Sequence, residues 1–381
     1  MPATGQQPIL CVVGARPNFM KIAPIMRAFR SRHVPALLLH TGQHYDADMN
    51  QRFFDDLGIP APQINLEVGS ASHAVQTAEI MRRVEPVLDR TRPAAVLVVG
   101  DVNSTIACAL VAAKKGVPVI HVEAGLRSFD RTMPEEINRV LTDQLADLLF
   151  TTERHALDNL VREGVDPARV HFVGNVMIDT LHHNLASAVP PALTLRDAGV
   201  PPERLAGGHA LLTLHRPSNV DDPAVLSRLV DCLNGIAREL PVAFPIHPRT
   251  RARMESFGLL ERLDPERVVQ LPPLGYPQLL GLMREARVVL TDSGGIQEET
   301  TALGVPCVTL RDNTERPITV SEGTNTLAGN DPARIRAALR AALDAPPARG
   351  RVPDGWDGRA AERISEVVEG WLDARASAQT A

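Results

Sequence analysis

The stretch AVLVVGDVNSTIACALVAAKKGVPVIHV (95–122) decides the fold of this chain. Two short apolar runs, AVLVV (95–99) and VPVIHV (117–122), enclose a longer amphipathic segment. Runs that are apolar throughout, rather than at every second residue, are typical of strands buried on both faces. The order strand, helix, strand therefore predicts two parallel strands joined by a crossover helix.

The same pattern extends outward in both directions. Further apolar runs are ILCVV (9–13), ALLLH (36–40), DLLFT (147–151), VHFV (170–173), ALLTL (210–214), VAFPI (242–246), RVVLT (287–291) and PCVTL (306–310). A Pro-rich stretch (188–208) separates two series of runs and indicates a linker or domain edge. We predict an α/β protein with two Rossmann-like doubly wound domains, at 1–185 and 205–358, with a cleft between them. The helical periodicity of 360–381 predicts a terminal helix that packs back on the N-terminal domain.

Length and composition narrow the class of protein. A chain of 381 residues is long enough for two domains, and 44% hydrophobic with 22% charged residues is typical of globular proteins. A net charge of −5 argues against a nucleic-acid partner. The opening MPATGQQPIL (1–10) lacks the basic start and apolar run of a signal peptide. No stretch of the sequence approaches the eighteen or so consecutive apolar residues of a membrane-spanning helix. The four cysteines do not have the spacing of a metal site or a redox pair. We therefore expect a cytoplasmic protein with reduced thiols and no membrane partner.

Titratable residues follow several of the predicted strands. In open parallel sheets, ligands bind beyond the carboxyl ends of the strands. The residues in or near these positions are Asp101, Glu123, Glu135, His215 and His247. Carboxylates together with a histidine suit proton transfer, because their environments can separate their pKa values.

The segment Asp292-Ser293-Gly294-Gly295 predicts an anion site. Small residues at a strand end, followed by the helical IQEETTALG (296–304), place free backbone N–H groups at a helix start. Glycines there let a phosphate approach the backbone closely. Glu299 either complements the helix dipole or accepts hydrogen bonds from ribose hydroxyls.

The first strand is followed by GARPNF (14–19), which lacks the second and third glycines of a dinucleotide fingerprint. Arg16 and Lys21 suit contact with phosphate or carboxylate, although such residues are also common as solvated surface charges. The histidines of the chain lack the HxxxH spacing of a metal site. We therefore predict a protein that uses no NAD, no metal ion and no other cofactor.

Taken together, these residues resemble the non-hydrolysing UDP-N-acetylglucosamine 2-epimerases. The landmarks that carry the resemblance are GARPNFMKIAP (14–24), TGQHYD (41–46), GDVNST (100–105), HVEAGLRS (121–128), PEEINR (134–139), GN (174–175), LHR (214–216), HP (247–248), TDSGGIQEE (291–299) and RDNTERP (311–317). They run in the family's order across nearly the whole chain.

The resemblance implies the two-domain fold shared with many nucleotide-sugar glycosyltransferases (GT-B-like), a UDP-sugar substrate and a homodimer. It implies that UDP is eliminated to leave a 2-acetamidoglucal and then re-added with the opposite configuration at C2. The catalytic residues that it implies are Asp101, Glu123, Glu135 and His215. The substrate-binding residues that it implies are Arg16, Lys21, His247, Ser293, Gly294, Gly295, Glu299 and Arg316.

Two departures from the family pattern bear on this comparison. Many members read HRxEN where this chain has His215-Arg216-Pro217-Ser218-Asn219, so a glutamate is absent. Some bacterial members bind a second UDP-sugar as an activator. Of that site Gln43 is retained, whereas Asp46 replaces a neutral or basic polar residue and 66–74 lacks the expected arginine or lysine.

Other functions remain open on the sequence alone. An epimerase of a UDP-diacetamido-uronic acid would share the nucleotide-binding residues. A hydrolysing epimerase would differ only in that water captures the intermediate. A glycosyltransferase would share the fold, which alone never settles function.

Overall fold

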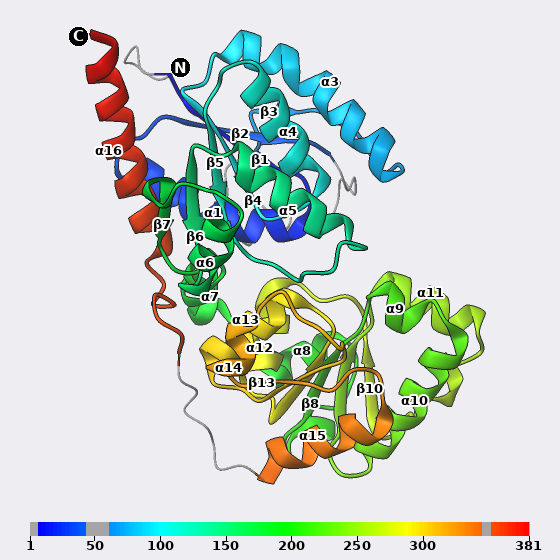
Figure 1. Cartoon of the computed structure of the whole chain (residues 1–381). Helices are drawn as coiled ribbons and strands as arrows, with labels where there is room; N and C mark the ends of the chain where they lie inside the picture. Colours follow the sequence, from blue (N-terminus) through cyan, green and yellow to red (C-terminus); the bar gives the residue numbers. More distant parts are fainter. Residues whose placement is uncertain (1–6, 43–60, 345–351, 381) are drawn as a thin grey trace. The chain divides into compact units, whose positions relative to one another are not determined.

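The structure is a computed structural model that describes residues 7–42, 61–344 and 352–380. The chain divides into two compact units (Figure 1). The first contains the described residues up to His182 and from Asp354 onward, and the second contains those from His183 to Pro353. The chain therefore leaves the first unit, forms the second, and returns to complete the first.

A parallel sheet lies at the centre of the first unit. Within the described residues its seven strands have the order β3-β2-β1-β4-β5-β6-β7, and every neighbouring pair is parallel. The strands are β1 (Ile9–Val13), β2 (Ala36–His40), β3 (Ile64–Asn65), β4 (Ala95–Val99), β5 (Val119–Val122), β6 (Leu148–Thr151) and β7 (Val170–Phe172). The chain proceeds outward from β1 to β3 and then resumes on the other side of β1 with β4. The topological switch point therefore lies between β1 and β4.

Helices of the first unit pack in two groups. On one side α3, α4 and α5 lie next to one another, and α1 packs against α16 (Figure 1). The helices are α1 (Arg16–Ser31), α3 (His73–Thr91), α4 (Asn103–Lys114), α5 (Pro134–Leu145), α6 (His155–Arg162), η1 (Pro167–Arg169), α7 (Val176–Asn184) and α16 (Ala360–Thr380). α7 continues past the boundary into the second unit.

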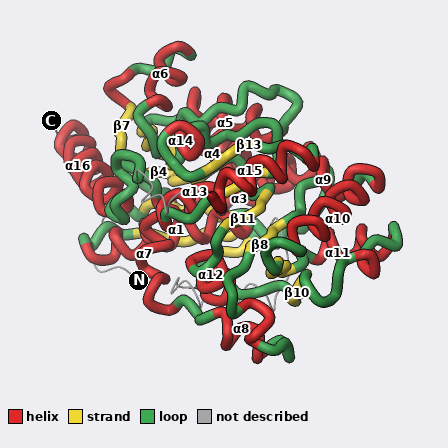
Figure 2. The backbone as a smooth tube through the Cα atoms, turned by 90° about the horizontal axis from the view of Figure 1, so that it is seen from below, coloured by secondary structure: helices red, strands yellow, loops and turns green. Residues whose placement is uncertain are grey.

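The second unit repeats the arrangement on a smaller sheet. Its strands have the order β10-β9-β8-β11-β12-β13, again all parallel, so the switch point lies between β8 and β11. The strands are β8 (Ala210–Thr213), β9 (Val242–Pro245), β10 (Val268–Leu271), β11 (Val288–Thr291), β12 (Cys307–Thr309) and β13 (Asn325–Leu327). The helices are η2 (Leu185–Ser187), α8 (Pro191–Asp197), η3 (Pro202–Leu205), α9 (Pro217–Val220), α10 (Pro223–Ala237), α11 (Pro248–Ser256), η4 (Leu260–Arg262), α12 (Tyr276–Arg284), α13 (Gly294–Leu303), α14 (Ile318–Ser321) and α15 (Pro332–Asp344). α9 contacts both α10 and α11, and the three lie together in Figure 1 and Figure 2.

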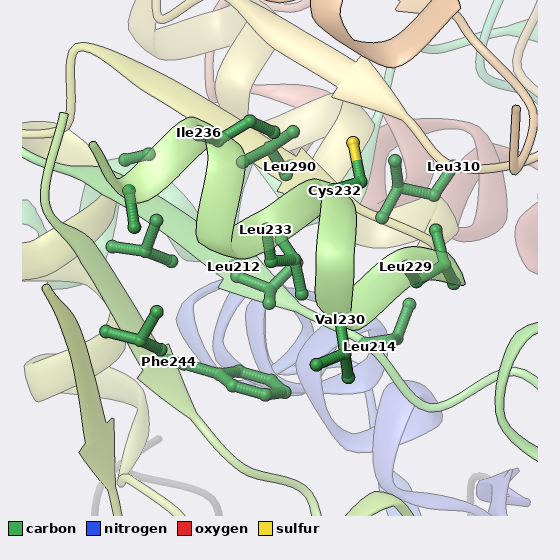
Figure 3. Packing of buried hydrophobic residues seen from close by; sticks show 14 of the residues in the cluster. Leu212, Leu214, Leu229, Val230, Cys232, Leu233, Ile236, Phe244, Leu290 and Leu310 are labelled. Carbon is green, nitrogen blue, oxygen red and sulfur yellow. The ribbon is translucent and has the colours of Figure 1, made fainter. Parts of the chain in front are cut away.

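The core of the second unit shows why these segments adopt this fold. Asp222 is the N-cap of α10, and its carboxylate accepts hydrogen bonds from the backbone N–H groups of Ala224 and Val225. One face of the helix then buries leucine, valine and isoleucine side chains against the strands, where Leu212 and Phe244 are 0% exposed (Figure 3). Burial of each such side chain contributes about 1.5–3 kcal/mol to folding.

The predicted fold class is confirmed: each unit is a doubly wound parallel sheet flanked by helices. Every apolar run identified in the sequence contains a strand of the structure. Three strands were not predicted, β3, β10 and β13, and two of these have only two or three residues. The Pro-rich stretch 188–208 contains α8 and η3, which belong to the second unit.

The C-terminal helix packs on the first unit, as predicted. Both carboxylate oxygens of Asp179 accept hydrogen bonds at the start of α16, from Ala360 N at 3.1 Å and Ala361 N at 2.7 Å. Trp356, 2% exposed, donates from Nε1 to the Thr152 carbonyl at 3.2 Å. These contacts fix the returning segment on α7 and on the end of β6.

Asp179 should make the stability of the first unit depend on pH. Its side chain is 7% exposed, and burial raises the pKa from 3.8 to about 6 even though the Ala361 and Ala360 N–H groups act in the opposite direction. The folded state therefore holds this proton more tightly than the unfolded state does. The contribution to stability is complete below pH about 4 and is lost as pH rises through 6, by roughly 3 kcal/mol.

The measurement is urea unfolding of the wild type and Asp179→Asn between pH 4 and 7.5. Asparagine has nearly the same shape as the protonated aspartic acid and stays uncharged throughout this pH range. The unfolding free energy of the wild type minus that of the variant should fall with rising pH. A difference that stays constant or increases with pH would contradict the burial of an ionisable Asp179.

Candidate functional site

In each unit, polar side chains gather at the carboxyl ends of the two strands that flank the switch point and of one strand beside them. In the first unit these are the ends of β1, β4 and β5, and in the second the ends of β8, β9 and β11. This is where open parallel sheets bind ligands.

The loop after β1 is held by one asparagine. Asn18 Oδ1 accepts hydrogen bonds from the N–H groups of Gly14 at 3.2 Å and Ala15 at 3.0 Å, and its Nδ2 donates to the Val99 carbonyl at 3.0 Å. The loop is thereby attached to the end of β4 across the switch point. Arg16 is the first residue of α1, and its side chain lies outside the described part of the structure.

Glu123 occupies an unusual backbone position directly after β5. Its φ is 69°, a left-handed conformation that few residues other than glycine adopt, and such strain concentrates at functional sites. Its Oε2 forms an ion pair with Lys21 Nζ, and the two side chains are 2% and 9% exposed. Lys21 is thus placed beside a predicted catalytic carboxylate, and the two side chains form a buried ion pair.

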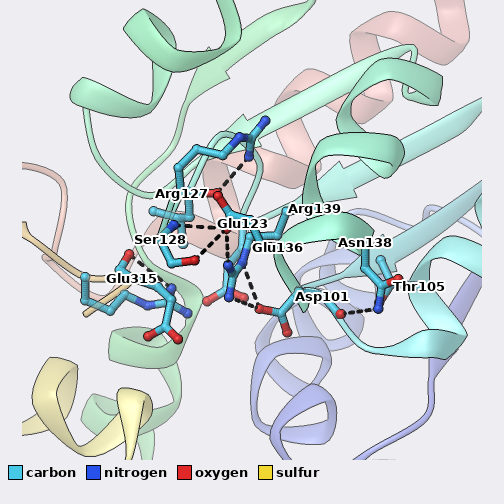
Figure 4. A network of polar contacts seen from close by, with 12 residues as sticks. Asp101, Thr105, Glu123, Arg127, Ser128, Glu136, Asn138, Arg139 and Glu315 are labelled. Carbon is cyan, nitrogen blue, oxygen red and sulfur yellow. Dashed lines mark hydrogen bonds and ion pairs between the residues drawn. The ribbon is translucent and has the colours of Figure 1, made fainter. Parts of the chain in front are cut away.

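Asp101, after β4, is held by α5 (Figure 4). Arg139 donates from Nε and Nη2 to Asp101 Oδ2 at 2.9 and 2.6 Å, and Asn138 Nδ2 donates to the Asp101 carbonyl at 2.8 Å. The Asp101 side chain keeps 23% of its surface exposed. The two carboxylates that follow neighbouring strands therefore each have a cationic partner and a fixed position.

The two glutamates of the PEE turn differ in environment. Glu135 is half-exposed at the start of α5. Glu136 is buried: it accepts hydrogen bonds from the N–H groups of Ser128 and Phe129, each at 2.9 Å, and from Arg139 Nη1 at 2.6 Å. Burial would raise the pKa of Glu136, but these donors outweigh it and lower the pKa. Glu136 thus holds the loop after β5 in place, whereas Glu135 does not have this structural role.

In the second unit, His215 is fixed by a buried aspartate. Asp292 Oδ1 lies 2.9 Å from His215 Nδ1, and Asp292 also accepts hydrogen bonds from the backbone N–H groups of His215 and Arg216. Burial would raise the pKa of Asp292, but His215 and the N–H groups lower it, so the carboxylate is ionised and only accepts. Nδ1 of His215 therefore donates, and Nε2 is the ring nitrogen that Asp292 does not engage.

His247 lies beside this pair, after β9. Its ring centroid is 5.6 Å from that of His215, and its Nδ1 accepts a hydrogen bond from Arg249 N at 3.2 Å. His247 is thereby the N-cap of α11.

The predicted anion site is the start of α13, after β11. Ser293 is the N-cap residue, and its side chain makes no capping hydrogen bond. A Cβ added at Gly294 would meet only Glu315 Oε2, at 4.0 Å, so a ligand has room to approach the backbone. Gly294 and Gly295 form the first turn, where unpaired N–H groups and the helix dipole favour an anion.

Two glutamates on α13 are buried beside this turn. Arg316 donates from Nε to Glu298 Oε1 at 2.6 Å. Glu299, 3% exposed, accepts a hydrogen bond from Tyr276 Oη at 2.8 Å. Burial, with a smaller effect of Glu298, raises the pKa of Glu299 to about 7, and the Tyr276 bond opposes this.

Sequence reasoning identified residues after strands but missed their partners. Arg139 and Tyr276 were not predicted as site residues, although Arg139 lies in the PEEINR motif, and Asp292 was predicted as part of the anion segment but not as the partner of His215. Their roles come from contacts with residues far away in the chain. Gln43 and Asp46, considered for an activator site, lie outside the described residues.

Known proteins match the chain over most of its length. The family model described as UDP-N-acetylglucosamine 2-epimerase matches residues 27–369. A UDP-N-acetylglucosamine 2-epimerase of Methanococcus maripaludis is 42% identical over 327 residues, 85% of this chain and 88% of that protein. A UDP-2,3-diacetamido-2,3-dideoxy-D-glucuronate 2-epimerase of Pseudomonas aeruginosa is 43% identical over 327 residues, 84% and 88% of the two chains.

A solved structure is similar over nearly the whole chain. The Methanocaldococcus jannaschii UDP-GlcNAc 2-epimerase in complex with UDP-GlcNAc and UDP has a TM-score of 0.84 and 39% sequence identity, covering 95% of this chain and 99% of that one. The sequence motifs, the two doubly wound sheets and these matches agree, and the chain belongs to the UDP-N-acetylglucosamine 2-epimerase family.

Proposed function

We propose that this protein interconverts UDP-N-acetylglucosamine and UDP-N-acetylmannosamine by eliminating UDP and re-adding it to a 2-acetamidoglucal. The observation that carries the proposal is the pair of carboxylates Asp101 and Glu123, each fixed by its own cation at the ends of neighbouring strands. Membership of the family and the relative solved with UDP-GlcNAc support the choice of sugar.

The chemistry requires acid/base groups and a stabilised leaving group. The proton on C2 is barely acidic until the C1–O bond to UDP begins to break. Inversion at C2 then needs protons to be moved on opposite faces of the sugar, hence more than one acid/base group. We assign this work to Asp101, Glu123, Glu135 and His215, with His215 acting through Nε2. Lys21 balances the charge of Glu123.

The leaving diphosphate needs positive charge and N–H donors. We assign its binding to Ser293, Gly294, Gly295 and Arg316 in the second unit, and to Arg16. His247 contributes a polar contact beside His215. Glu299, held by Tyr276, is assigned to the ribose hydroxyls.

Gly294→Ala should weaken nucleotide binding without harming the fold. The added methyl group has space in the free protein, because its nearest neighbour is Glu315 Oε2 at 4.0 Å. In the complex it would keep the phosphate from the helix start, and we expect the Kd for UDP to rise about tenfold or more, equivalent to about 1.4 kcal/mol. Calorimetric titration with UDP measures this change.

Gly235→Ala is the matched control, since Gly235 lies within α10 of the same unit with nothing within 4 Å of its added Cβ. It should leave UDP affinity unchanged. Equal UDP affinities for Gly294→Ala and the wild type would remove the α13 N-terminus from the diphosphate site.

A second substrate is favoured by one observation. The P. aeruginosa UDP-2,3-diacetamido-2,3-dideoxy-D-glucuronate 2-epimerase is as similar to this chain, at 43% identity, as the M. maripaludis enzyme at 42%. Both sugars share the nucleotide and the acetamido group at C2, and they differ at C3 and C6. Comparison of kcat/KM for the two UDP-sugars decides between them.

Proton NMR of the protein with UDP-N-acetylglucosamine in heavy water tests the reaction itself. We expect deuterium at C2 of both epimers, little free N-acetylmannosamine, and activity that survives EDTA and needs no added NAD. An epimerised product that retains its original C2 proton would rule out the elimination mechanism.

We also propose that the protein is a cytoplasmic homodimer. All four cysteines are buried free thiols, which suits a reducing compartment. None of the helices formed by the described residues has the length and apolar character needed to cross a membrane. Light scattering at working concentration tests the dimer.

A further inference from the structure

A buried histidine lies next to the turns that carry Asp101 and Glu123 in the first unit. His121, the third residue of β5, is 0% exposed, and both of its ring nitrogens are hydrogen bonded. Nδ1 lies 2.6 Å from Asp143 Oδ1, and Nε2 lies 2.9 Å from the carbonyl oxygen of Gly100. The reaction assigned above uses neither His121 nor Asp143.

The partners of the ring determine its protonation. The Gly100 carbonyl can only accept, so Nε2 donates. Asp143 accepts hydrogen bonds from the Gly125 N–H group at 3.0 Å and pairs with Arg127 Nη2 at 2.7 Å. Burial would raise the pKa of Asp143, but His121 and Arg127 outweigh it and lower the pKa. Asp143 is therefore a carboxylate that accepts from Nδ1 as well, and the ring carries both protons.

The charges around the ring are balanced. The imidazolium of His121 and the guanidinium of Arg127 both face Asp143, and Arg127 also donates from Nε to Glu163 Oε1 at 2.8 Å. Two cations and two carboxylates thus form one group in which each charge has an opposite partner. This pairing offsets the cost of burying the charges of His121 and Asp143.

The pair connects two turns that each contain a residue with positive φ. Gly100 has φ 68° and directly precedes Asp101, and Nε2 of His121 holds its carbonyl. Asp143 holds the N–H group of Gly125, two residues after Glu123, which itself has φ 69°. One histidine–aspartate pair therefore ties together the two turns that carry Asp101 and Glu123.

We propose that His121, held as an imidazolium by Asp143, is a positioning residue that sets the turns bearing Asp101 and Glu123 for proton transfer at C2. The proposal rests on the proposed function. A substrate touches neither residue, because both side chains are 0% exposed. Their effect is on the position of the carboxylates, where a misplacement of about 1 Å costs up to about a hundredfold in rate.

A matched pair of variants separates the two bonds. The side-chain nitrogen of glutamine lies near the place of Nε2 and can still donate to Gly100, whereas that of asparagine lies near Nδ1 and can still donate to Asp143. We expect His121→Asn to lower kcat by about thirtyfold or more with little change in KM, since binding groups are untouched. His121→Gln should retain most of kcat. Val87→Ala in the core of the same unit is the control for lost stability, and its kcat should equal that of the wild type.

The protonation state of the His121 ring is measured independently of activity, by NMR of the whole protein with 15N-labelled histidine. Loss of signals in His121→Asn assigns the His121 ring. We expect both ring nitrogens to carry directly bonded protons, with the Nδ1 proton far downfield of the amides. A ring with one bare nitrogen would overturn the imidazolium, and an unchanged kcat in His121→Asn would overturn the positioning role. If the wild type fails to epimerise its substrate, the proposed function fails, and the NMR result still decides the charge of His121.

Discussion

Asp292→Asn is expected to lower kcat for epimerisation on the order of a hundredfold or more, the scale of a lost general acid or base. The Asp292 carboxylate accepts from His215 Nδ1 at 2.9 Å and so fixes the proton on that nitrogen. Asparagine can turn its NH2 group toward Nδ1, which would then become the acceptor. The proton would move to Nε2, and His215 would lose its function as a base while remaining in place.

The measurement is kcat and KM for the UDP-sugar, together with UDP affinity by calorimetry. UDP affinity should change little, because Asp292 is 0% exposed. Asp222→Asn is the matched control, since Asp222 also accepts backbone N–H groups, at the start of α10. Full activity of Asp292→Asn would show that the tautomer of His215 does not matter.

Gly100→Ala is expected to reduce kcat about a hundredfold or more and to destabilise the first unit by about 1–3 kcal/mol. Gly100 has φ 68°, and an added Cβ would lie 3.0 Å from Lys21 Nζ and 3.2 Å from Glu123 Oε2. Both atoms are ends of flexible side chains, so the ion pair would move rather than the backbone. The displaced group is the carboxylate to which we assign proton transfer.

Gly116→Ala separates the two effects. Gly116 has φ 70° and nothing within 4 Å of an added Cβ, so the substitution has the same backbone cost without the contact. Both variants should lose similar free energy of unfolding, measured in urea, while only Gly100→Ala loses kcat. Equal kcat values for the two variants would contradict the placement of Glu123 in the reaction.

The sequence predicts most of the strands because a parallel strand that is buried on both faces appears in the sequence as a continuous apolar run. Runs such as ILCVV (9–13) are apolar throughout, and β1 has the same bounds. β3 and β13 have two and three residues and are partly exposed, so no run marks them. β10 is different: Val268–Leu271 is mostly buried but is interrupted by a glutamine.

The candidate residues were predictable where the fold alone places them, at the ends of strands. The partners that tune them were not, because such contacts join distant parts of the chain. Arg139 meets Asp101 across 38 residues, and Asp292 meets His215 across 77. The motif HVEAGLRS does not indicate that both ring nitrogens of its histidine are hydrogen bonded, because their partners, Gly100 and Asp143, lie about twenty residues away in the chain.

The second unit is encoded as an insertion within the first, and this sets an order of events during synthesis on the ribosome. The docking sites for Trp356 and α16, at Thr152 and Asp179, emerge long before the residues that fill them. All of the second unit, up to Pro353, is translated in that interval. Domains generally mature from the N-terminus onward. Here the first unit to begin folding is the last to be completed, and the newborn chain carries an unfilled surface on α7 until translation reaches its final helix.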